Sequence, residues 1–507
     1  MRNMILRMNW HLLLAAMLGL VSAHAPGQVY STLWGEQGEL YDPHGRLPNF
    51  AYAGYRFGAQ PPQVRETVAS VADFGAKPHD GVDDTEAFKR AIAETDSGVI
   101  EIPAGLYEIS DIIWIQKPNL VLRGAGSGAT IVHVTATLEG VRPNMGATTS
   151  GSPTSNYSWS GGFFWVKGGY ASTPRVAITA PNRRGDRTVI VDDPNTFIAG
   201  QRVLIEQTDN DERTLMGHLY ADDPGDTRKL TGDLKPMLVA QVVSIDGKTI
   251  TLNRPLRWDV RPEWSPTVRA FEPRVHDVGI EGMTISFESV PYEGHFSELG
   301  RNAIAFNGTS DCWVRDVKIK DCDSAIFFTG VQGTIDGLTV LSSRKPNRGT
   351  QGHHGVTMGL DNLLMNFAFK THFIHDITMT RLSAGNVIKN GSGVNLSLDH
   401  HKRANHANLY CNIDAGDGSD LWRCGGGASL GKHAGAWTTF WGISADKAVS
   451  WPRDSFGPGI MNLVGLHTEQ DPVLDQKGKW LEVIDPEQLE PRDLHKAQRN
   501  RAYGRRN

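Results

Sequence analysis

The sequence predicts an all-β protein, a single-stranded right-handed parallel β-helix with an N-terminal capping helix and a small β insertion. Short stretches with apolar residues at every second position are separated by Gly, Asn and Asp, which is typical of strands with one buried face. A six-residue pattern, apolar-x-(Gly/Asp)-apolar-x-apolar, recurs along the second half of the chain. Gly and Pro make up 55 and 26 of the 507 residues, which indicates many turns and few long helices.

The recurring pattern sets the size of the predicted coil. It starts at Ile280, Val314, Ile335 and Ile374, so successive starts differ by 34, 21 and 39 residues. A coil of about twenty residues fits the shortest step, two coils fit the longest, and loops account for the remainder. A single unit cannot bury its apolar face alone, whereas stacked units share a continuous core.

The N-terminus has the pattern of a secretory signal peptide over residues 1–25. Arg2 and Arg7 precede an apolar run from Leu12 to Val21, and small residues follow. The run is too short to span a bilayer. We therefore expect a bacterial protein exported to the periplasm or the extracellular space, with no membrane association.

The remaining segments follow in order. Residues 26–65, rich in Gly, Pro and aromatic residues, suggest an extended arm, and residues 66–470 the β-helix. Thr85 opens an amphipathic stretch that predicts a helix over 85–94. Residues 143–174 suggest a long aromatic loop, and residues 181–272 a small β insertion. The pattern fades after about residue 470, which predicts a polar C-terminal tail over 471–507.

Charge and cysteine content exclude several classes of protein. The chain carries 51 Lys+Arg and 56 Asp+Glu, and it has no basic stripe, so we expect no nucleic-acid partner. Four cysteines in 507 residues exclude a disulfide-stapled scaffold, and none forms a C-x-x-C pair. The sequence determines neither a disulfide pairing nor the oligomeric state.

Three successive segments resemble the entry coils of the pectate-lyase superfamily, the glycoside-hydrolase-28-like β-helices. They are residues 74–88 (FGAKPHDGVDDTEAF), residues 99–107 (VIEIPAGLY) and residues 120–126 (LVLRGAG). The resemblance implies a right-handed parallel β-helix in which helix 85–94 plugs the open N-terminal end. It also implies activity on carbohydrate, without selecting among the lyases, hydrolases, epimerases and phage tailspikes of that superfamily.

A second resemblance covers residues 41–55 and 371–443. These segments are similar to a branch of secreted bacterial β-helix proteins that carry a C-terminal domain of unknown function. The shared elements are His375-Asp376, Asp399-His400-His401 and a Gly-x-His-x-Gly stretch around His433.

Histidines are concentrated in one band of the chain. Eight of the 18 lie between residues 353 and 433, namely His353, His354, His372, His375, His400, His401, His406 and His433. Residues one coil apart stack on the same face of a solenoid. The spacings of 21 residues from His354 to His375, and of 25 from His375 to His400, therefore predict that these side chains meet.

The same band contains cations and acids that suit a lyase acting on an acidic polysaccharide. Elimination from a uronic acid needs a neutralised carboxylate and a base near its working pKa. We predict acid–base catalysis by His375, Asp399, His400 and His401, with Asp399 orienting a neighbouring imidazole. The predicted substrate-binding residues are His354, Arg381, Lys402, Arg403, Trp422, Arg423 and His433.

Two other functions remain open from the sequence. A glycoside hydrolase would need two carboxylates flanking the scissile bond, and Asp399 with Asp414 or Asp417 is the only attractive pair. A non-catalytic glycan-binding β-helix would use the histidines structurally. We expect no metal or other cofactor, although Asp414, Asp417 and Asp420 form a candidate calcium site.

Overall fold

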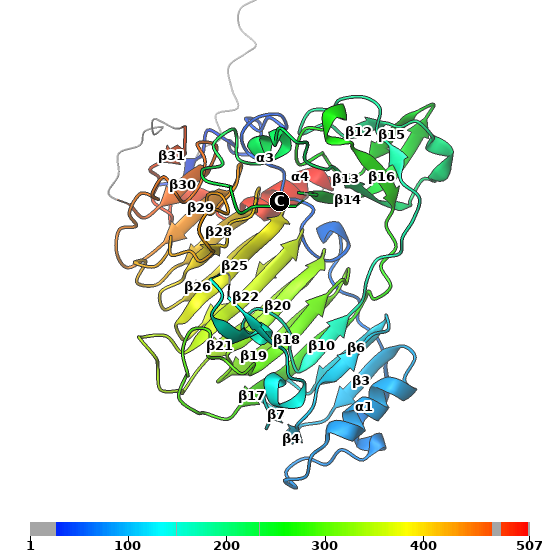
Figure 1. The fold of residues 1–507 in the computed structure, drawn as a ribbon, viewed down its shortest axis with the longest axis vertical. Coiled ribbons are helices and arrows are strands. Elements are labelled where there is room, and N and C mark those ends of the chain that lie inside the picture. Colours follow the sequence, from blue (N-terminus) through cyan, green and yellow to red (C-terminus); the bar gives the residue numbers. More distant parts are fainter. Residues whose placement is uncertain (1–26, 149, 233, 469–477, 505–507) are drawn as a thin grey trace, which may run out of the picture.

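The chain winds into a parallel β-helix (Figure 1) in the computed structural model, which describes residues 27–148, 150–232, 234–468 and 478–504. The predicted signal peptide lies outside these residues. Two long sheets form the walls, and their strands pair in parallel throughout. This architecture confirms the predicted all-β solenoid.

One wall is a fifteen-stranded sheet. In order, it contains β2 (Thr67–Ser70), β3 (Gly98–Ile102), β6 (Leu120–Gly124), β17 (Gly279–Phe287), β19 (Trp313–Lys320), β21 (Thr334–Leu341), β23 (Leu363–Met365), β26 (Val387–Gly393), β28 (Leu409–Asp414), β29 (Thr439–Ser444), β30 (Asn462–Leu466) and β31 (Trp480–Glu482). Off this path, β4 (Gly105–Ile109) pairs with β7 (Thr130–Val134), which also pairs with β17, and β24 (Ala368–Phe369) pairs with β21 and β26.

The other wall is a seven-stranded sheet, which carries the site described below. Its order is β27 (Leu398–His400), β25 (Phe373–Ala384), β22 (Gly352–Leu360), β20 (Ser324–Val331), β18 (Asn302–Asn307), β10 (Phe164–Lys167) and β5 (Ile113–Ile115).

The strand register confirms that three of the four repeat starts occupy the same position in successive coils. Ile280 pairs with Val314, and Val314 pairs with Ile335, so these three starts lie on one ladder of the fifteen-stranded sheet. The next residue on that ladder is Leu364. Ile374 instead lies in β25 of the other sheet. Its six-residue pattern marks a strand with one buried face, but this strand does not occupy the same position in the coil.

The core runs inside the solenoid between the walls. Along the seven-stranded sheet, one inward row contains Ile304, Ile326, Val356, Ile377 and Leu398, each paired with the next and fully buried. Burial of an aliphatic side chain of this kind contributes about 1.5–3 kcal/mol. This repeated contribution fixes the register, so the residues between these positions must point outward.

Helix α1 (Thr85–Glu94) covers the N-terminal end of the core, as predicted. Phe88 and Ala91 are fully buried on its apolar face. Its N-cap residue is Asp84, and the hydroxyl of Thr85 accepts a hydrogen bond from the backbone N–H of Ser110 at 2.9 Å. By covering the terminal coil, the helix protects an otherwise open edge from pairing with other chains.

An antiparallel six-stranded sheet forms the insertion. Its order is β11 (Val176–Ala177), β16 (Thr267–Ala270), β13 (Arg202–Glu206), β14 (Met237–Asp246), β15 (Thr249–Leu252) and β12 (Thr188–Ile190), and helix α3 (Thr214–Leu219) packs beside it. Figure 1 shows it beside the solenoid at the end opposite α1. Buried ion pairs from Arg254 and Arg257 to Asp361 join it to the β-helix.

The arm and the C-terminal segment cover the outer face of the fifteen-stranded sheet together. Strand β1 (Val29–Tyr30) pairs with β32 (Leu489–Glu490), and Trp34 and Phe50 pack in one cluster with Leu494 of α4 (Leu494–Ala502). Residues 478–504 are therefore folded, in contrast to the polar tail expected from residue 471. Their few apolar side chains lack the coil pattern but are anchored by this contact.

Three smaller features complete the fold. A hairpin of β8 (Met145–Ala147) and β9 (Pro153–Ser155) and the short helix α2 (Leu138–Val141) lie within or beside the predicted aromatic loop. The four cysteines are free thiols. Within the described residues, no helix is both long enough and apolar enough to cross a membrane.

Candidate active site

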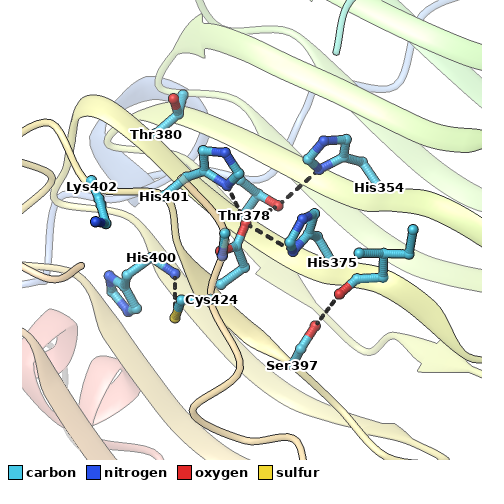
Figure 2. A network of polar contacts seen from close by, with 12 residues as sticks. His354, His375, Thr378, Thr380, Ser397, His400, His401, Lys402 and Cys424 are labelled. Atoms are coloured by element: carbon cyan, nitrogen blue, oxygen red, sulfur yellow. Dashed lines mark hydrogen bonds and ion pairs between the residues drawn. The ribbon is translucent and has the colours of Figure 1, made fainter. Parts of the chain in front are cut away.

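Five imidazoles gather on the outer side of the seven-stranded sheet, near its C-terminal end. They belong to His353 and His354 in β22, His375 in β25, His401 just after β27, and His295 in the loop 288–301. His354 and His375 are register partners on adjacent strands, and their rings stack with centroids 5.1 Å apart. The 21-residue spacing thus predicted a true neighbour pair. In Figure 2 the side chains of His354, His375 and His401 point toward one another.

The loop 288–301 contributes the fifth imidazole of the cluster, that of His295. The ring of His295 lies 4.6 Å from the ring of His353 and 6.1 Å from that of His375, measured between centroids. Phe296 stacks on His295 at 3.6 Å. This loop precedes the histidine-rich band in the sequence, so the band alone gave no sign that His295 belongs to the site.

Asp399 is the buried carboxylate at the centre of the site. Its Oδ2 lies 2.9 Å from Nδ1 of His401 and 3.4 Å from Nδ1 of His375, and the Thr378 hydroxyl donates to the same oxygen at 3.1 Å. The backbone N–H of Gly425 donates to Oδ1 at 2.7 Å. Both oxygens are therefore occupied, which leaves Asp399 to orient imidazoles and not to contact a substrate directly.

These contacts also determine the ionisation of Asp399. Burial alone raises the pKa of a carboxyl, but here the imidazoles of His375 and His401 and the Gly425 N–H oppose it. Together they hold the pKa of Asp399 below its ordinary value, so the group is a carboxylate at neutral pH.

A second buried carboxylate, Glu298, comes from the loop 288–301. Its Oε1 lies 3.2 Å from Nδ1 of His353, and it accepts hydrogen bonds from the hydroxyls of Tyr292 at 2.5 Å and Ser158 at 3.2 Å. Burial raises the pKa of Glu298, and the contact with His353 more than offsets this effect, so the pKa lies below its ordinary value. The site therefore contains two carboxylates, each paired with an imidazole.

Burial keeps most of the imidazoles neutral. It lowers the pKa of His375 to about 3, although the Asp399 carboxylate acts in the opposite direction. It lowers the pKa of His354 well below the ordinary value, with a further contribution from neighbouring imidazoles. Desolvation, together with His353, lowers the pKa of His295 to about 4.

His401 is the accessible member of the Asp399 group. Its side chain is 31% exposed, compared with 6% for His375 and 0% for Asp399. Since Nδ1 of His401 faces Asp399, its Nε2 is the nitrogen left for a substrate. The Asp399–His401 pair thus has the geometry of an oriented general base.

The site lies at one end of a continuous outward row of the seven-stranded sheet. Each member pairs in register with the next across neighbouring strands, in the order Trp114, Trp165, Ala305, Phe327, Thr357, Thr378 and Asp399. At the far end the rings of Trp114 and Trp165 stack 4.6 Å apart. Five strand spacings separate Trp165 from Asp399, or about 24 Å at roughly 4.8 Å per strand.

A second outward row, two residues further along each strand, is more open and more polar. Lys167 pairs with Asn307, whose amide donates to the hydroxyl of Thr329 at 2.7 Å. Lys167 and Thr329 are exposed, and Asn307 is half-buried. His401, two residues after Asp399, occupies the corresponding place at the other end of the sheet.

His400 does not belong to this cluster, contrary to the sequence-based assignment. On β27, Leu398 and His400 point inward while Asp399 points outward, because strand side chains alternate. The His400 ring is fully buried against Tyr410 and Phe456, and Figure 2 shows it directed away from the other imidazoles. Burial lowers its pKa to about 4.

Three predicted substrate-binding residues have structural partners instead. Trp422 packs edge-on against Phe440 and donates its indole N–H to the Ser450 carbonyl at 2.6 Å. Arg423 pairs with Asp420 at 2.8 Å and donates to backbone carbonyls of β25. His433 Nδ1 lies 3.1 Å from the His400 carbonyl.

The predicted cations lie around the cluster and not within it. Lys402 and Arg403 are half-buried in the turn after β27, where both have left-handed backbone conformations with φ of 63° and 61°. Lys402 lies beside Gly426, and Figure 2 shows it apart from His354, His375 and His401. Arg381 is exposed on β25.

The candidate calcium ligands are engaged separately. Asp414 accepts from the backbone of Gly416, and Asp417 pairs with Lys447 at 2.5 Å. Asp420 lies 3.0 Å from Nε2 of His372 and also pairs with Arg423. These contacts are those of turns and ion pairs.

A family model described as rhamnogalacturonase A/epimerase, pectate lyase-like, matches residues 68–165. This match and the continuous coils define a pectate-lyase-type parallel β-helix and confirm the resemblance predicted from the entry coils. The resemblance to a branch with a C-terminal domain of unknown function stays a prediction. No curated protein matches the chain in sequence.

Among solved structures, the chain is similar to a tailspike of the Acinetobacter baumannii bacteriophage AP22 in complex with capsular saccharide, with 8% identity and a TM-score of 0.43. The likeness covers 78% of this chain and 56% of the tailspike, so the chain spans little more than half of that protein. An alginate lyase from Paenibacillus sp. gives 8% identity, a TM-score of 0.37, and coverage of 82% and 97%. At these TM-scores the likeness supports no inference about activity.

Proposed function

We propose that the protein is an exported carbohydrate-active enzyme, a polysaccharide lyase that cleaves an acidic, uronate-containing glycan by β-elimination. The observation that carries this proposal is the Asp399–His401 pair. It places an accessible imidazole, oriented by a buried carboxylate, at one end of the seven-stranded sheet. Export rests on the signal-peptide pattern of residues 1–25.

In this proposal, Nε2 of His401 takes the proton from the sugar carbon that bears the carboxylate. The electron pair forms the new double bond as the glycosidic oxygen leaves from the adjacent carbon, and that oxygen takes a proton from solvent or from the protein. Asp399 fixes the ring and stabilises the imidazolium formed. His375 acts as a positioning residue, because its ring contacts Asp399 from the buried side.

The first outward row is buried between Ala305 and Asp399, so the second, more open row is the one that supports a polymeric substrate. The Trp114–Trp165 stack offers an aromatic face to a sugar ring. Lys167 Nζ lies 5.7 Å from the Trp114 ring, and the guanidinium carbon of Arg142 lies 5.8 Å from it, so both add positive charge there. A glycan reaching from this platform to His401 would cross several strands, which favours a chain of acidic sugars over a small molecule.

The arrangement of carboxylates gives the hydrolase alternative less support than elimination. Asp399 is fully buried with both oxygens occupied, whereas Asp414 lies exposed on β28 of the other sheet. Glu298 is also buried, at 1% exposure. A general acid must reach the glycosidic oxygen, and these carboxylates are not placed to do so.

The test is incubation of the mature protein with pectin, polygalacturonate, alginate, chondroitin, hyaluronan and ulvan. Ultraviolet absorbance of unsaturated uronate ends and the number of reducing ends would be measured together. We expect both to rise with one substrate class. Reducing ends without absorbance would support a hydrolase, and binding without product would support a glycan-binding β-helix; either result would overturn the proposal.

A further inference from the structure

We propose that His295, His353 and His375 bind a divalent first-row transition-metal ion, with Zn²⁺ as the best-suited example. This site adjoins the Asp399–His401 pair, because Asp399 contacts His375, but the proposal does not depend on the elimination reaction. It differs from the sequence-based expectation that no metal is bound and from the candidate calcium site at Asp414, Asp417 and Asp420.

The positions of the three side chains suit metal binding. One ring nitrogen from each lies within 4.8 Å of the others. Tetrahedral zinc with Zn–N bonds of about 2.0–2.1 Å places its ligand nitrogens roughly 3.3 Å apart, so modest ring movements would close the site. His353 and His375 are held on adjacent strands, while His295 comes from a loop and is exposed, which leaves it free to adjust.

Each of the two buried rings is backed by a carboxylate. Nδ1 of His353 lies 3.2 Å from Glu298, and Nδ1 of His375 lies 3.4 Å from Asp399. These contacts leave Nε2 of both rings as the nitrogens available to an ion. A carboxylate behind a ligating imidazole is the usual outer shell of a metal site, where it fixes the ring and raises its basicity.

The charge of the site also favours a dication. Asp399 and Glu298 are buried carboxylates, and among the described residues neither forms an ion pair with a lysine or an arginine. Buried charge is costly unless it is balanced. A dication between the imidazoles would balance two carboxylates.

The donor set selects the class of metal. Imidazole nitrogen suits Zn²⁺ and its neighbours in the first row, whereas Ca²⁺ and Mg²⁺ prefer oxygen ligands. Three histidines leave at least one position open for water or another ligand, as in catalytic zinc sites.

His375, Asp399 and His401 form a second group whose donor atoms lie within 4.8 Å of one another. It is a weaker candidate because Asp399 already accepts bonds on both oxygens, from Gly425 on one and from Thr378 on the other. The two groups share only His375, so variants at the other positions distinguish them.

The test uses the mature protein, stripped with a chelator, reloaded with Zn²⁺ and passed through a desalting column. The number of metal ions per chain would be measured by elemental mass spectrometry, and the affinity by titration of the stripped protein with Zn²⁺. Co²⁺ loading would give an absorption spectrum that reports the ligands. We expect one tightly bound Zn²⁺ per chain and no comparable retention of Ca²⁺.

His295→Ala should lose the bound ion without unfolding, since His295 lies exposed in a loop. Glu298→Gln should weaken Zn²⁺ binding by about 10–100-fold, as for outer-shell partners elsewhere. His401→Ala is the matched control and should keep the ion. Two outcomes would overturn the proposal: no Zn²⁺ retained by the folded wild-type chain, or retention that His401→Ala abolishes and His295→Ala does not.

Discussion

Nδ1 of His401 lies 2.9 Å from Oδ2 of Asp399, a carboxylate that is itself fully buried and held by the Gly425 backbone. The contact joins a buried charge to a ring that reaches solvent. It orients the imidazole with Nε2 outward, and it stabilises the ring when it gains a proton.

Replacement of His401 should therefore remove catalysis and leave the fold intact. His401→Ala is expected to lower kcat by at least about a hundredfold, the usual contribution of a general base. Its unfolding temperature should change little, because the side chain is 31% exposed. His467→Ala, an exposed histidine in the C-terminal coil, is the matched control and should keep full activity. An active His401→Ala enzyme would contradict the assignment.

Asp399→Asn should lower kcat with little effect on KM, since Asp399 positions the base and does not contact substrate. An amide cannot stabilise the imidazolium as a carboxylate does, so we expect a fall in kcat of about a hundredfold or more. Steady-state kinetics at several pH values would check this. An increase in KM at unchanged kcat would show instead that Asp399 serves substrate binding.

The aromatic platform should matter for long substrates only. Trp165→Ala removes its stack with Trp114. A stacking contact contributes about 0.5–1.5 kcal/mol, so we expect the KM for polymer to rise by roughly two- to tenfold. Oligosaccharides too short to reach from His401 to the platform should be cleaved as by the wild type. Equal losses on long and short substrates would argue against this path for the glycan.

Acid should destabilise the fold through buried histidines away from the site. Burial lowers the pKa of His406 to about 3, with its neighbours Arg257 and His218 acting in the same direction and Asp361 and the Ala404 carbonyl opposing them. It lowers the pKa of His218 to about 4. An unfolded histidine titrates near 6.5, so the unfolded state takes up protons first as the pH falls below that value.

The resulting stabilisation is present above pH 6.5 and is lost between there and the folded pKa values. Each of these two histidines should lower the free energy of unfolding at pH 5 by about 2 kcal/mol relative to pH 8. Urea unfolding of the wild type at both pH values would measure the total. In His406→Gln the difference between the two pH values should shrink by about 2 kcal/mol. An unchanged difference would show that His406 does not titrate on unfolding in this range.

The attachment of the insertion to the β-helix should depend on one buried carboxylate, that of Asp361. Asp361 is 1% exposed and pairs with Arg254 at 2.9 Å and with Arg257, both also buried. Asp361→Asn would leave two buried guanidinium groups without a counter-charge, at a cost of about 3–5 kcal/mol. Asp226→Asn, at an exposed pair with Arg228, should change the unfolding free energy little, because solvent screens both charges. Similar unfolding free energies for the two variants would contradict this role for Asp361.

Much of the fold was predictable because burial imposes a period of two on each strand and a repeat on each coil. Ile280, Val314 and Ile335 share one ladder for that reason. Ile374 has the same local pattern but lies in the other wall, since a pattern of one buried face does not specify which sheet the strand joins.

The site could be predicted from the sequence only where the stacking of successive coils determines which residues are neighbours. The coil spacing brought His354 beside His375. His400 was assigned to the site although its inward position follows from alternation, since only the register shows which of two adjacent histidines faces the core. His295 and Glu298 were missed because a long loop delivers them, and loop conformation leaves no periodic signal.

The central claim, elimination by the Asp399–His401 pair, is tested most directly by the mass of the products. Oligosaccharides released by the wild type from the substrate found above would be compared by mass spectrometry with those of His401→Ala. We expect wild-type products with one unsaturated uronate end, each lighter by one water than the hydrolytic product, and almost none from His401→Ala. Fully saturated products from the wild type, or unsaturated products made equally well by His401→Ala, would contradict it.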